Sequence, residues 1–457
     1  MNSLLLLKPG RCIAIATVLI WSTILSCRGA SGERRLLLGH RPSVVTSLSS
    51  VGKVPATNEI SLAIGLPLSH EGELDSLLAE LYDSHSTNFH RFLSPTEFAA
   101  RFGPTENDYQ TVIKFAKDNG LVISGTYSNR MVLDVVGSAA NVEQAFQIRL
   151  NHYQHPTEHR VFFAPDSNPS VPTNVPVRDM WGLSDFSQPR PLAHQRPSAA
   201  LAPLNYNGTG PSGSYQGHDF RNAYAPGASL VGSGQIAAVA EFDGYYTNDI
   251  NTYESNCGYT NVPLTNVLIK VSGNPGYSGL ANAVAEVSLD IEMIIAMAPG
   301  LSRLTVYEGS NPYDVFNRIV TDDSAKQISC SWSWGANPGS IWTLGGSTLD
   351  SQLKEMVVQG QSFFQSSGDS DAYTAAEAIN SSTGPVPVDS IYVTSVGGTS
   401  LTMSGTARSS ETVWNWGGNE GSGGGVSSNY TIPSWQTNVS MTANSGSTIY
   451  RNFPMSP

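Results

Sequence analysis

Two carboxylates four residues apart form the most chemically informative pair in this 457-residue sequence. Glu286 and Asp290 interrupt a run, residues 284–298, that is otherwise almost wholly apolar and is therefore expected to form a buried helix. Side chains at positions i and i+4 lie on one face of a helix. Burying two like charges there is costly unless one carboxyl holds a proton or a partner compensates. We expect the pair to act as acid and base; the alternative is an exposed polar stripe, a role that Glu292 fits better.

A third carboxylate, Asp369, follows the apolar stretch at residues 362–366 and a Ser-Gly turn. The carboxyl end of a parallel strand is where an α/β sheet exposes its functional groups. The alternative is that Asp369 caps the next helix, which is a common role for Asp after Gly. The residues alone leave both interpretations open.

Histidine is scarce in the second half of the sequence, and this limits the mechanism. Eight of the nine histidines precede residue 205, and His218 is the only one that follows it. A Ser-His-Asp mechanism would therefore require His218 as the base, ahead of the first core strand. A carboxylate base fits better. Because carboxyl groups have low pKa values, such an enzyme is expected to work at acid pH.

Ser400 is the serine that most resembles an exposed nucleophile, because it ends a Gly-Gly-Thr-Ser segment at residues 397–400. Leu401, Thr402 and Met403 follow it in a pattern typical of a strand, with no sign of a helix start. We therefore expect Ser400 to be structural.

The elements that must position these residues fall into two regions. Between residues 56 and 185, helical periodicity at 70–86 and 107–120 alternates with strand-like segments, which predicts an α+β domain. Residues 187–214 are rich in Pro, Ala, Ser and Gly and are expected to be an exposed, cleavable linker. After the linker, short apolar strands alternate with helices, which predicts an α/β domain of roughly seven mostly parallel strands.

Composition and the N-terminus indicate an exported protein. Lys8 and Arg11 precede an apolar run, and small residues near Ala30 offer a cleavage site, so residues 1–30 are expected to be a signal peptide. Without it, Cys257 and Cys330 remain, which could form one disulfide but not a zinc site. From residue 205 onward there are 8 basic and 20 acidic residues of the 25 and 37 in the whole chain. This acidic half offers no basic surface for nucleic acid.

Several ordered motifs resemble those of the sedolisin family, the serine-carboxyl peptidases. They lie at residues 283–300, 366–372, 392–401 and 417–436, while residues 93–123 resemble the family's activation propeptide. The resemblance implies a subtilisin-like α/β fold, with a mostly parallel sheet and flanking helices, preceded by an α+β ferredoxin-like prodomain. The implied order is a prodomain at 50–186, a linker with the maturation site at 187–214 and a peptidase domain at 215–457.

The resemblance also assigns roles. Glu286 matches the general base, Asp290 the acid that orients it, and Asp369 the oxyanion-hole carboxyl, which must be protonated to donate to a developing oxyanion. Glu241 matches a residue that supports the acid pair, and Trp332 and Gly424 match residues beside the substrate. Trp334 is the alternative to Trp332, because it also precedes a glycine.

The resemblance implies a secreted, acid-acting zymogen of a serine-type endopeptidase. Its partners would be a polypeptide substrate and its own prodomain, acting as intramolecular inhibitor and chaperone, with no nucleic acid and no membrane after signal removal. The family's nucleophilic Gly-Thr-Ser segment and its calcium-binding loop have no match before Pro457. We therefore expect a peptidase domain that is incomplete at its C-terminus and inactive by itself. Calcium is expected for the family, but its ligands are not expected in this chain. The alternative is a non-catalytic secreted relative that binds peptides or an inhibitor.

Overall fold

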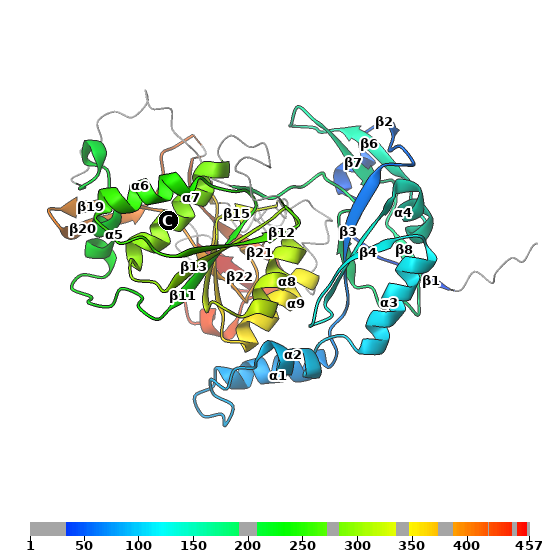
Figure 1. Ribbon diagram of the computed structural model, residues 1–457, viewed down its shortest axis with the longest axis horizontal. Helices are drawn as coiled ribbons and strands as arrows, with labels where there is room; N and C mark the ends of the chain where they lie inside the picture. Colours follow the sequence, from blue (N-terminus) through cyan, green and yellow to red (C-terminus); the bar gives the residue numbers. More distant parts are fainter. Residues whose placement is uncertain are drawn as a thin grey trace, which may run out of the picture. The chain divides into compact units, whose positions relative to one another are not determined.

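Two regions of regular structure follow one another along the chain, an α+β region and then an α/β region (Figure 1). The computed structural model describes the following residues: 33–191, 208–271, 283–334, 347–372, 387–418, 420–440 and 446–454. The expected signal peptide at 1–30 and the middle of the expected linker lie outside the described residues.

The first region is built on a four-stranded antiparallel sheet of order β4-β5-β3-β9. The sheet and its helices follow the order β3, three helices, β4, β5, α4 and β9, with β6 to β8 between α4 and β9. The first and last strands of this sheet, β3 and β9, are neighbours. This is a ferredoxin-like arrangement, as predicted. The helices of this region are α1 (Glu71–Leu81), α2 (Pro95–Arg101), α3 (Glu106–Asp118) and α4 (Ala139–Phe146). The strands are β1 (Arg34–Leu36), β2 (Ser50–Lys53), β3 (Glu59–Gly65), β4 (Val122–Thr126), β5 (Val132–Ser138), β6 (Leu150–Gln154), β7 (Val161–Pro165), β8 (Ser170–Pro172), β9 (Asp179–Trp181) and β10 (Arg190–Pro191).

Local sequence explains where these helices begin. Ser94 and Glu97 form a capping box around the first turn of α2, with Pro95 at its first position. Thr105 and Ser138 cap α3 and α4 by accepting hydrogen bonds from backbone N–H groups. The helices predicted at residues 70–86 and 107–120 correspond to α1 and α3.

The second region contains a six-stranded parallel sheet of order β12-β13-β11-β14-β16-β18 within the described residues, which confirms the predicted α/β class. Its strands are β11 (Ile236–Glu241), β12 (Leu264–Ile269), β13 (Arg303–Gly309), β14 (Gln327–Cys330), β16 (Ser362–Ser366) and β18 (Thr394–Val396). Its helices are α5 (Gly217–Tyr224), α6 (Thr247–Cys257), α7 (Ala283–Met297), α8 (Pro312–Asp322) and α9 (Thr348–Val358).

The helices cover the sheet in two groups. Helix α7 contacts β11 and is itself contacted by α5 and α6. Helices α8 and α9 pack on each other, against β13 and β16, and also contact α1, α2 and β5 of the first region (Figure 1). Leu74, Phe98 and Phe102 of the first region belong to the same hydrophobic core as Phe316 and Leu353 of the second. The two regions therefore share one core.

Six further strands complete the described residues. They are β15 (Trp332–Ser333), β17 (Ser370–Ala372), β19 (Thr399–Ser404), β20 (Ala407–Val413), β21 (Gly421–Thr431) and β22 (Tyr450–Phe453). Strands β19 and β20 form a hairpin in which Ser400 is exposed and opposite Thr412. Ser400 is therefore a strand residue, as predicted.

Candidate active site

The carboxyl ends of three adjacent parallel strands carry polar side chains. Glu241 is the last residue of β11, Ser331 directly follows β14, and Asp369 follows β16 after a two-residue turn. Because β11, β14 and β16 are neighbours in the sheet, these residues meet at one edge. This is the edge at which α/β sheets bind their ligands.

Helix α7 brings Glu286 and Asp290 to this edge. Only 7% of Glu286 is exposed, although it is a carboxylate in the first turn of the helix. Ser331 Oγ donates a hydrogen bond to Asp290 Oδ1 over 2.7 Å. Trp332 Nε1 donates to Glu241 Oε2 over 2.6 Å, and both residues are fully buried. Glu241, Glu286 and Asp290 therefore form one carboxylate cluster.

Burial and mutual repulsion make this cluster hold protons. Burial raises the pKa of Glu286, and the negative charges of Asp290 and Asp369 raise it further. Burial raises the pKa of Asp290 as well, although hydrogen bonds from Ser331 and Glu241 act in the opposite direction. The pKa of Glu241 lies well above its ordinary range because of burial and the nearby Asp290. The cluster thus takes up and releases protons at higher pH than exposed carboxylates do.

A glycine-rich strand fixes the turn that carries Asp369. Gly421 N donates to Asp369 O over 3.1 Å, and Ser367 Oγ donates to Gly423 O over 2.7 Å. A Cβ atom on Gly423 would lie 2.1 Å from Ser367 O, so only glycine fits at that position. Gly424 is buried and pairs with Ala372 of β17, directly after this turn.

The two tryptophans that compete for the predicted substrate position differ in their contacts. Trp332 bonds to Glu241 and lies in β15, whereas the Trp334 ring packs edge-on against Phe242 and Phe316. Trp332 is therefore the tryptophan of the carboxylate cluster.

A strand from the expected linker covers this edge. Strand β10 pairs antiparallel with β15, with Arg190 opposite Ser333 and Pro191 opposite Trp332. The same two-residue strand contacts α7, the helix that bears Glu286. Arg190 and Pro191 of the linker thus lie in extended conformation beside the carboxylate cluster.

Glu158 ties this strand to the first region. Its Oε2 is 2.5 Å from Arg190 Nη2 and accepts a hydrogen bond from Arg160 Nε over 2.5 Å. Its Oε1 is 3.3 Å from His155 Nε2. Arg160 also donates to the backbone carbonyls of Asp185 and Phe186, at the start of the linker. We call Glu158, Arg160, Arg190 and His155 the linker clasp.

The predicted residues Glu241, Glu286, Asp290 and Trp332 come together, and Asp369 and Gly424 lie in the adjoining turn and strand. Sequence reasoning missed Ser331, although a serine directly after a buried strand was an available signal. It also missed the linker clasp, which no local pattern indicates.

The described residues hold no group of three or more His, Cys, Asp or Glu side chains suited to a metal ion. Cys257 and Cys330 are buried thiols that are not joined, so the disulfide considered above does not form. In the same described ranges, no helix is long and apolar enough to cross a membrane.

These features define a class of α/β protein. Its candidate site is a cluster of carboxylates at the carboxyl edge of the parallel sheet, and a short strand that follows the α+β region lies against it. Residues 46–178 match the activation domain of pro-kumamolisin. The chain is similar to the serine-carboxyl peptidases of the sedolisin family over most of its length, and its first region matches the activation domain found in that family.

Three relatives show what share of a full-length protein this chain covers. Xanthomonalisin of Xanthomonas sp. (strain T-22) is 28% identical over 446 residues, which cover 86% of this chain and 53% of the relative. Kumamolisin of Bacillus sp. (strain MN-32) is 27% identical, covering 92% and 77%. Sedolisin of Pseudomonas sp. (strain 101) is 29% identical, covering 83% and 68%. The chain thus spans about half the length of xanthomonalisin.

Proposed function

We propose that this protein is a secreted serine-carboxyl peptidase, made as a zymogen and active at acid pH. The observation that carries this proposal is the cluster of Glu241, Glu286 and Asp290 at the carboxyl edge of the sheet, in which Glu241 and Glu286 are buried, with Asp369 close enough for its charge to act on Glu286. Structural ion pairs are seldom built from like charges, so such a cluster favours catalysis.

In this proposal Glu286 is the general base that takes the proton of a serine hydroxyl. Asp290 holds Glu286 in place, and Glu241 supports Asp290 from the strand below. Asp369 keeps its proton and donates it in a hydrogen bond to the oxyanion of the tetrahedral intermediate. Glu286 must be ionised to accept the proton while Asp369 is protonated to donate one, so activity is confined to a pH window whose lower limit is set by the raised pKa of Glu286 and whose upper limit is set by loss of the proton from Asp369.

Ser331 and Ser400 do not supply the nucleophile. Ser331 is engaged as a donor to Asp290, and Ser400 is exposed on the β19–β20 hairpin. We therefore expect this 457-residue chain to stay uncut at about pH 4 and not to hydrolyse a peptide library.

The prodomain is proposed to inhibit the site in the same chain. The pairing of β10 with β15 supports this, because an extended peptide that adds to an edge strand is a common mode of substrate recognition. Trp332 and Gly424 would then contact the substrate backbone once the linker has left.

The test begins with the coding sequence. Reading the gene beyond the codon for Pro457 is expected to show a Gly-Thr-Ser segment, and its product is expected to cut itself within residues 187–214 near pH 4. Glu286→Gln should abolish this cut, because an amide cannot accept the proton. Glu292→Gln, six residues along the same helix, is the matched control and should still mature.

A stop codon directly after Pro457 in a stable, exported protein would contradict the peptidase proposal. It would favour the alternative, a non-catalytic relative whose cleft binds extended peptides. Self-cleavage of the present chain that is lost in Ser400→Ala would contradict the structural role of Ser400.

A further inference from the structure

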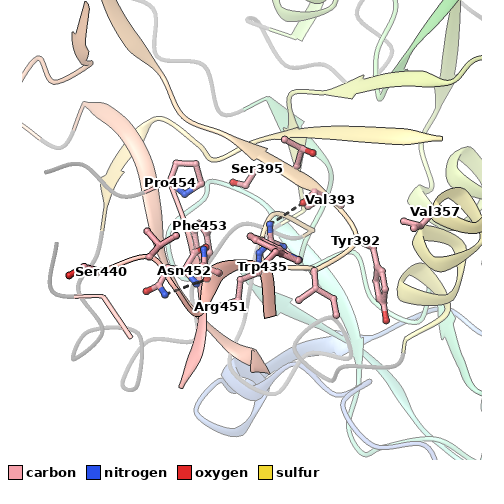
Figure 2. Close-up of a pocket in the computed structure, with 14 residues that line it drawn as sticks. Val357, Tyr392, Val393, Ser395, Trp435, Ser440, Arg451, Asn452, Phe453 and Pro454 are labelled. Carbon is pink, nitrogen blue, oxygen red and sulfur yellow. Dashed lines mark hydrogen bonds between the residues drawn. The ribbon is translucent and has the colours of Figure 1, made fainter. Parts of the chain in front are cut away.

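A pocket of about 630 Å³ opens at the edge of the parallel sheet, formed by residues outside the carboxylate cluster (Figure 2). The edge strand β18 and the residues before it line one side. Strand β22 and the short 3-10 helix Ser434–Gln436 line the other. The volume falls within the range of small-molecule sites.

The walls of the pocket are largely apolar and aromatic. Tyr392, Val393, Trp435, Val439 and Phe453 are among the lining side chains. Trp435 is 61% exposed, which is unusual for an indole in a folded domain. The pocket therefore suits a ligand with an apolar or aromatic body.

Arg451 is the exception in this lining, because it is a buried cation with unused donors. It is only 2% exposed. Its Nη2 donates to Val393 O over 3.0 Å, and its Cζ lies 5.8 Å from the centre of the Trp435 ring (Figure 2). In the part of the chain that the structure describes, Nε and Nη1 have no hydrogen-bond partner. A buried guanidinium with unpaired N–H groups is costly, so an acceptor is expected to satisfy them.

Asp389, whose charge acts on Arg451, forms its hydrogen bonds with other side chains. Asp389 Oδ2 accepts hydrogen bonds from Ser427 Oγ over 2.8 Å and from Asn429 Nδ2 over 3.1 Å. The Tyr430 hydroxyl donates to Asp350 Oδ1. Burial lowers the pKa of Arg451 to about 10, although the charges of Asp389 and Tyr430 act to raise it. Arg451 is therefore a cation at neutral and acid pH and remains able to bind an anion.

We propose that this pocket binds a carboxylate carried on an apolar or aromatic body, with the carboxylate on Arg451 and the body against Trp435 and Phe453. A planar carboxylate accepts parallel hydrogen bonds from a guanidinium, which makes it the best matched anion for this side chain. The ring of Trp435 already lies over the guanidinium, so an aromatic body would extend an existing stack. The proposal is independent of the peptidase function, because no residue of the carboxylate cluster lines the pocket.

The experiment compares acids with their neutral amides on the whole chain at pH 6.5, by calorimetry or ligand-detected NMR. The first pair is 3-phenylpropionate and 3-phenylpropanamide, and the second is N-acetylphenylalanine and its amide. Each acid is expected to bind at least about tenfold more tightly than its amide, since the amide cannot form charge-assisted hydrogen bonds with the guanidinium. Binding of both acids would show a site for small apolar acids, and binding of N-acetylphenylalanine alone would show a site for peptide C-termini.

Variants separate the two parts of the site. Arg451→Gln should remove the preference for the acid, while Trp435→Leu should weaken acid and amide alike. Trp435 is largely exposed, so its replacement leaves the fold intact even where loss of the buried Arg451 does not. Arg408→Gln is the matched control, because Arg408 lies on β20 and pairs with Glu411 at the surface. Equal binding of acid and amide to the unaltered chain, no binding of either acid, or an acid preference that survives Arg451→Gln in folded protein would overturn the proposal.

Discussion

Glu286 is more buried than a carboxylate normally is, and its titration links the site to the stability of the molecule. Because burial raises the pKa of Glu286 in the folded chain, the folded state binds a proton that the unfolded chain has already lost. This contribution to stability is fully present below the ordinary pKa of about 4.3. It is lost as the pH rises through the folded-state pKa.

We therefore predict that the chain is more stable near pH 5 than near pH 7.5, and that Glu286→Gln reduces this difference. The amide side chain carries no charge that must be buried. The free energy of unfolding of the variant should therefore exceed that of the unaltered chain by at least about 1 kcal/mol at pH 7.5. Urea unfolding at both pH values measures this. Glu59→Gln, an exposed residue on β3, is the control and should leave the difference unchanged. If both variants lose as much stability between pH 5 and pH 7.5 as the unaltered chain does, Glu286 is not a buried acid.

Single residues also show what sequence reasoning can reach. Glu286 and Asp290 were predictable because an apolar run exposes any charge within it, and Asp369 because it ends an apolar strand. Ser331 and Arg451 act through partners 41 and 58 positions away, which no local pattern encodes. Their roles depend on which strands become neighbours.

At the scale of elements, helix α7 and the parallel strands followed from apolar periodicity, because burial on one or both faces leaves that mark on the sequence. Strand β3, by contrast, was not among the predicted strands, although it is central to the first sheet. Strand β10 has only two residues and includes a proline, so its pairing depends on β15 and on the linker clasp rather than on its own sequence.

The linker clasp is predicted to hold β10 in place and to weaken in acid. His155 Nδ1 accepts hydrogen bonds from the backbone N–H groups of Thr157 and Glu158, so protonation of that nitrogen breaks both. Burial lowers the pKa of His155, and the nearby Arg160 and Arg190 lower it further against the pull of Glu158 and Asp185. Its contribution is therefore complete above about pH 6.5 and is lost as the pH falls through the folded-state pKa.

The contribution of Glu158 to stability has the same pH dependence as that of His155, because it too is lost as the pH falls. Burial acts to raise its pKa, but the ion pairs with Arg190 and Arg160 outweigh burial and lower it. Asp185, which also faces Arg160, has a pKa that burial raises and that nearby His152 lowers. The ion pairs of Glu158 are present above its ordinary pKa and are lost as the pH falls through the lowered value.

We predict that Glu158→Gln speeds hydrogen exchange in residues 187–191 at pH 7 by about fivefold or more, since one or two kcal/mol of local stability corresponds to that factor. In the unaltered chain the same protection should fall between pH 7 and pH 4, after correction for intrinsic exchange. Glu59→Gln again serves as the control. Unchanged protection in Glu158→Gln would mean that β10 is held by its pairing with β15 alone.

At the scale of the whole molecule, the two regions are joined by buried polar contacts as well as by a shared core. Asn129 Nδ2 donates to Asn317 Oδ1 over 2.9 Å and to Glu355 Oε2 over 3.0 Å. Asp179 of β9 accepts from Thr348 N over 3.0 Å and from Thr348 Oγ1 over 2.6 Å, at the first residue of α9. An N–H group at a helix start has no partner within the helix, so Asp179 of the first region adds a second cap to α9 beside that of Ser347, whose Oγ accepts from Asp350 N.

This cap predicts that residues 34–454 melt in one transition and that Asp179→Ala lowers its midpoint. Removing the carboxylate leaves the buried Thr348 N–H unpaired, which costs about 1–3 kcal/mol. Gly65→Ala tests the same contact from the other side, because a Cβ at Gly65 would lie 1.8 Å from Thr348 Oγ1 and 2.6 Å from Asp179 Oδ1. Calorimetry should show both variants melting earlier, with the first region separating as its own transition, whereas Asp83→Ala at an exposed site should melt like the unaltered chain. Two transitions in the unaltered chain, or variants that melt unchanged, would show that the regions fold independently.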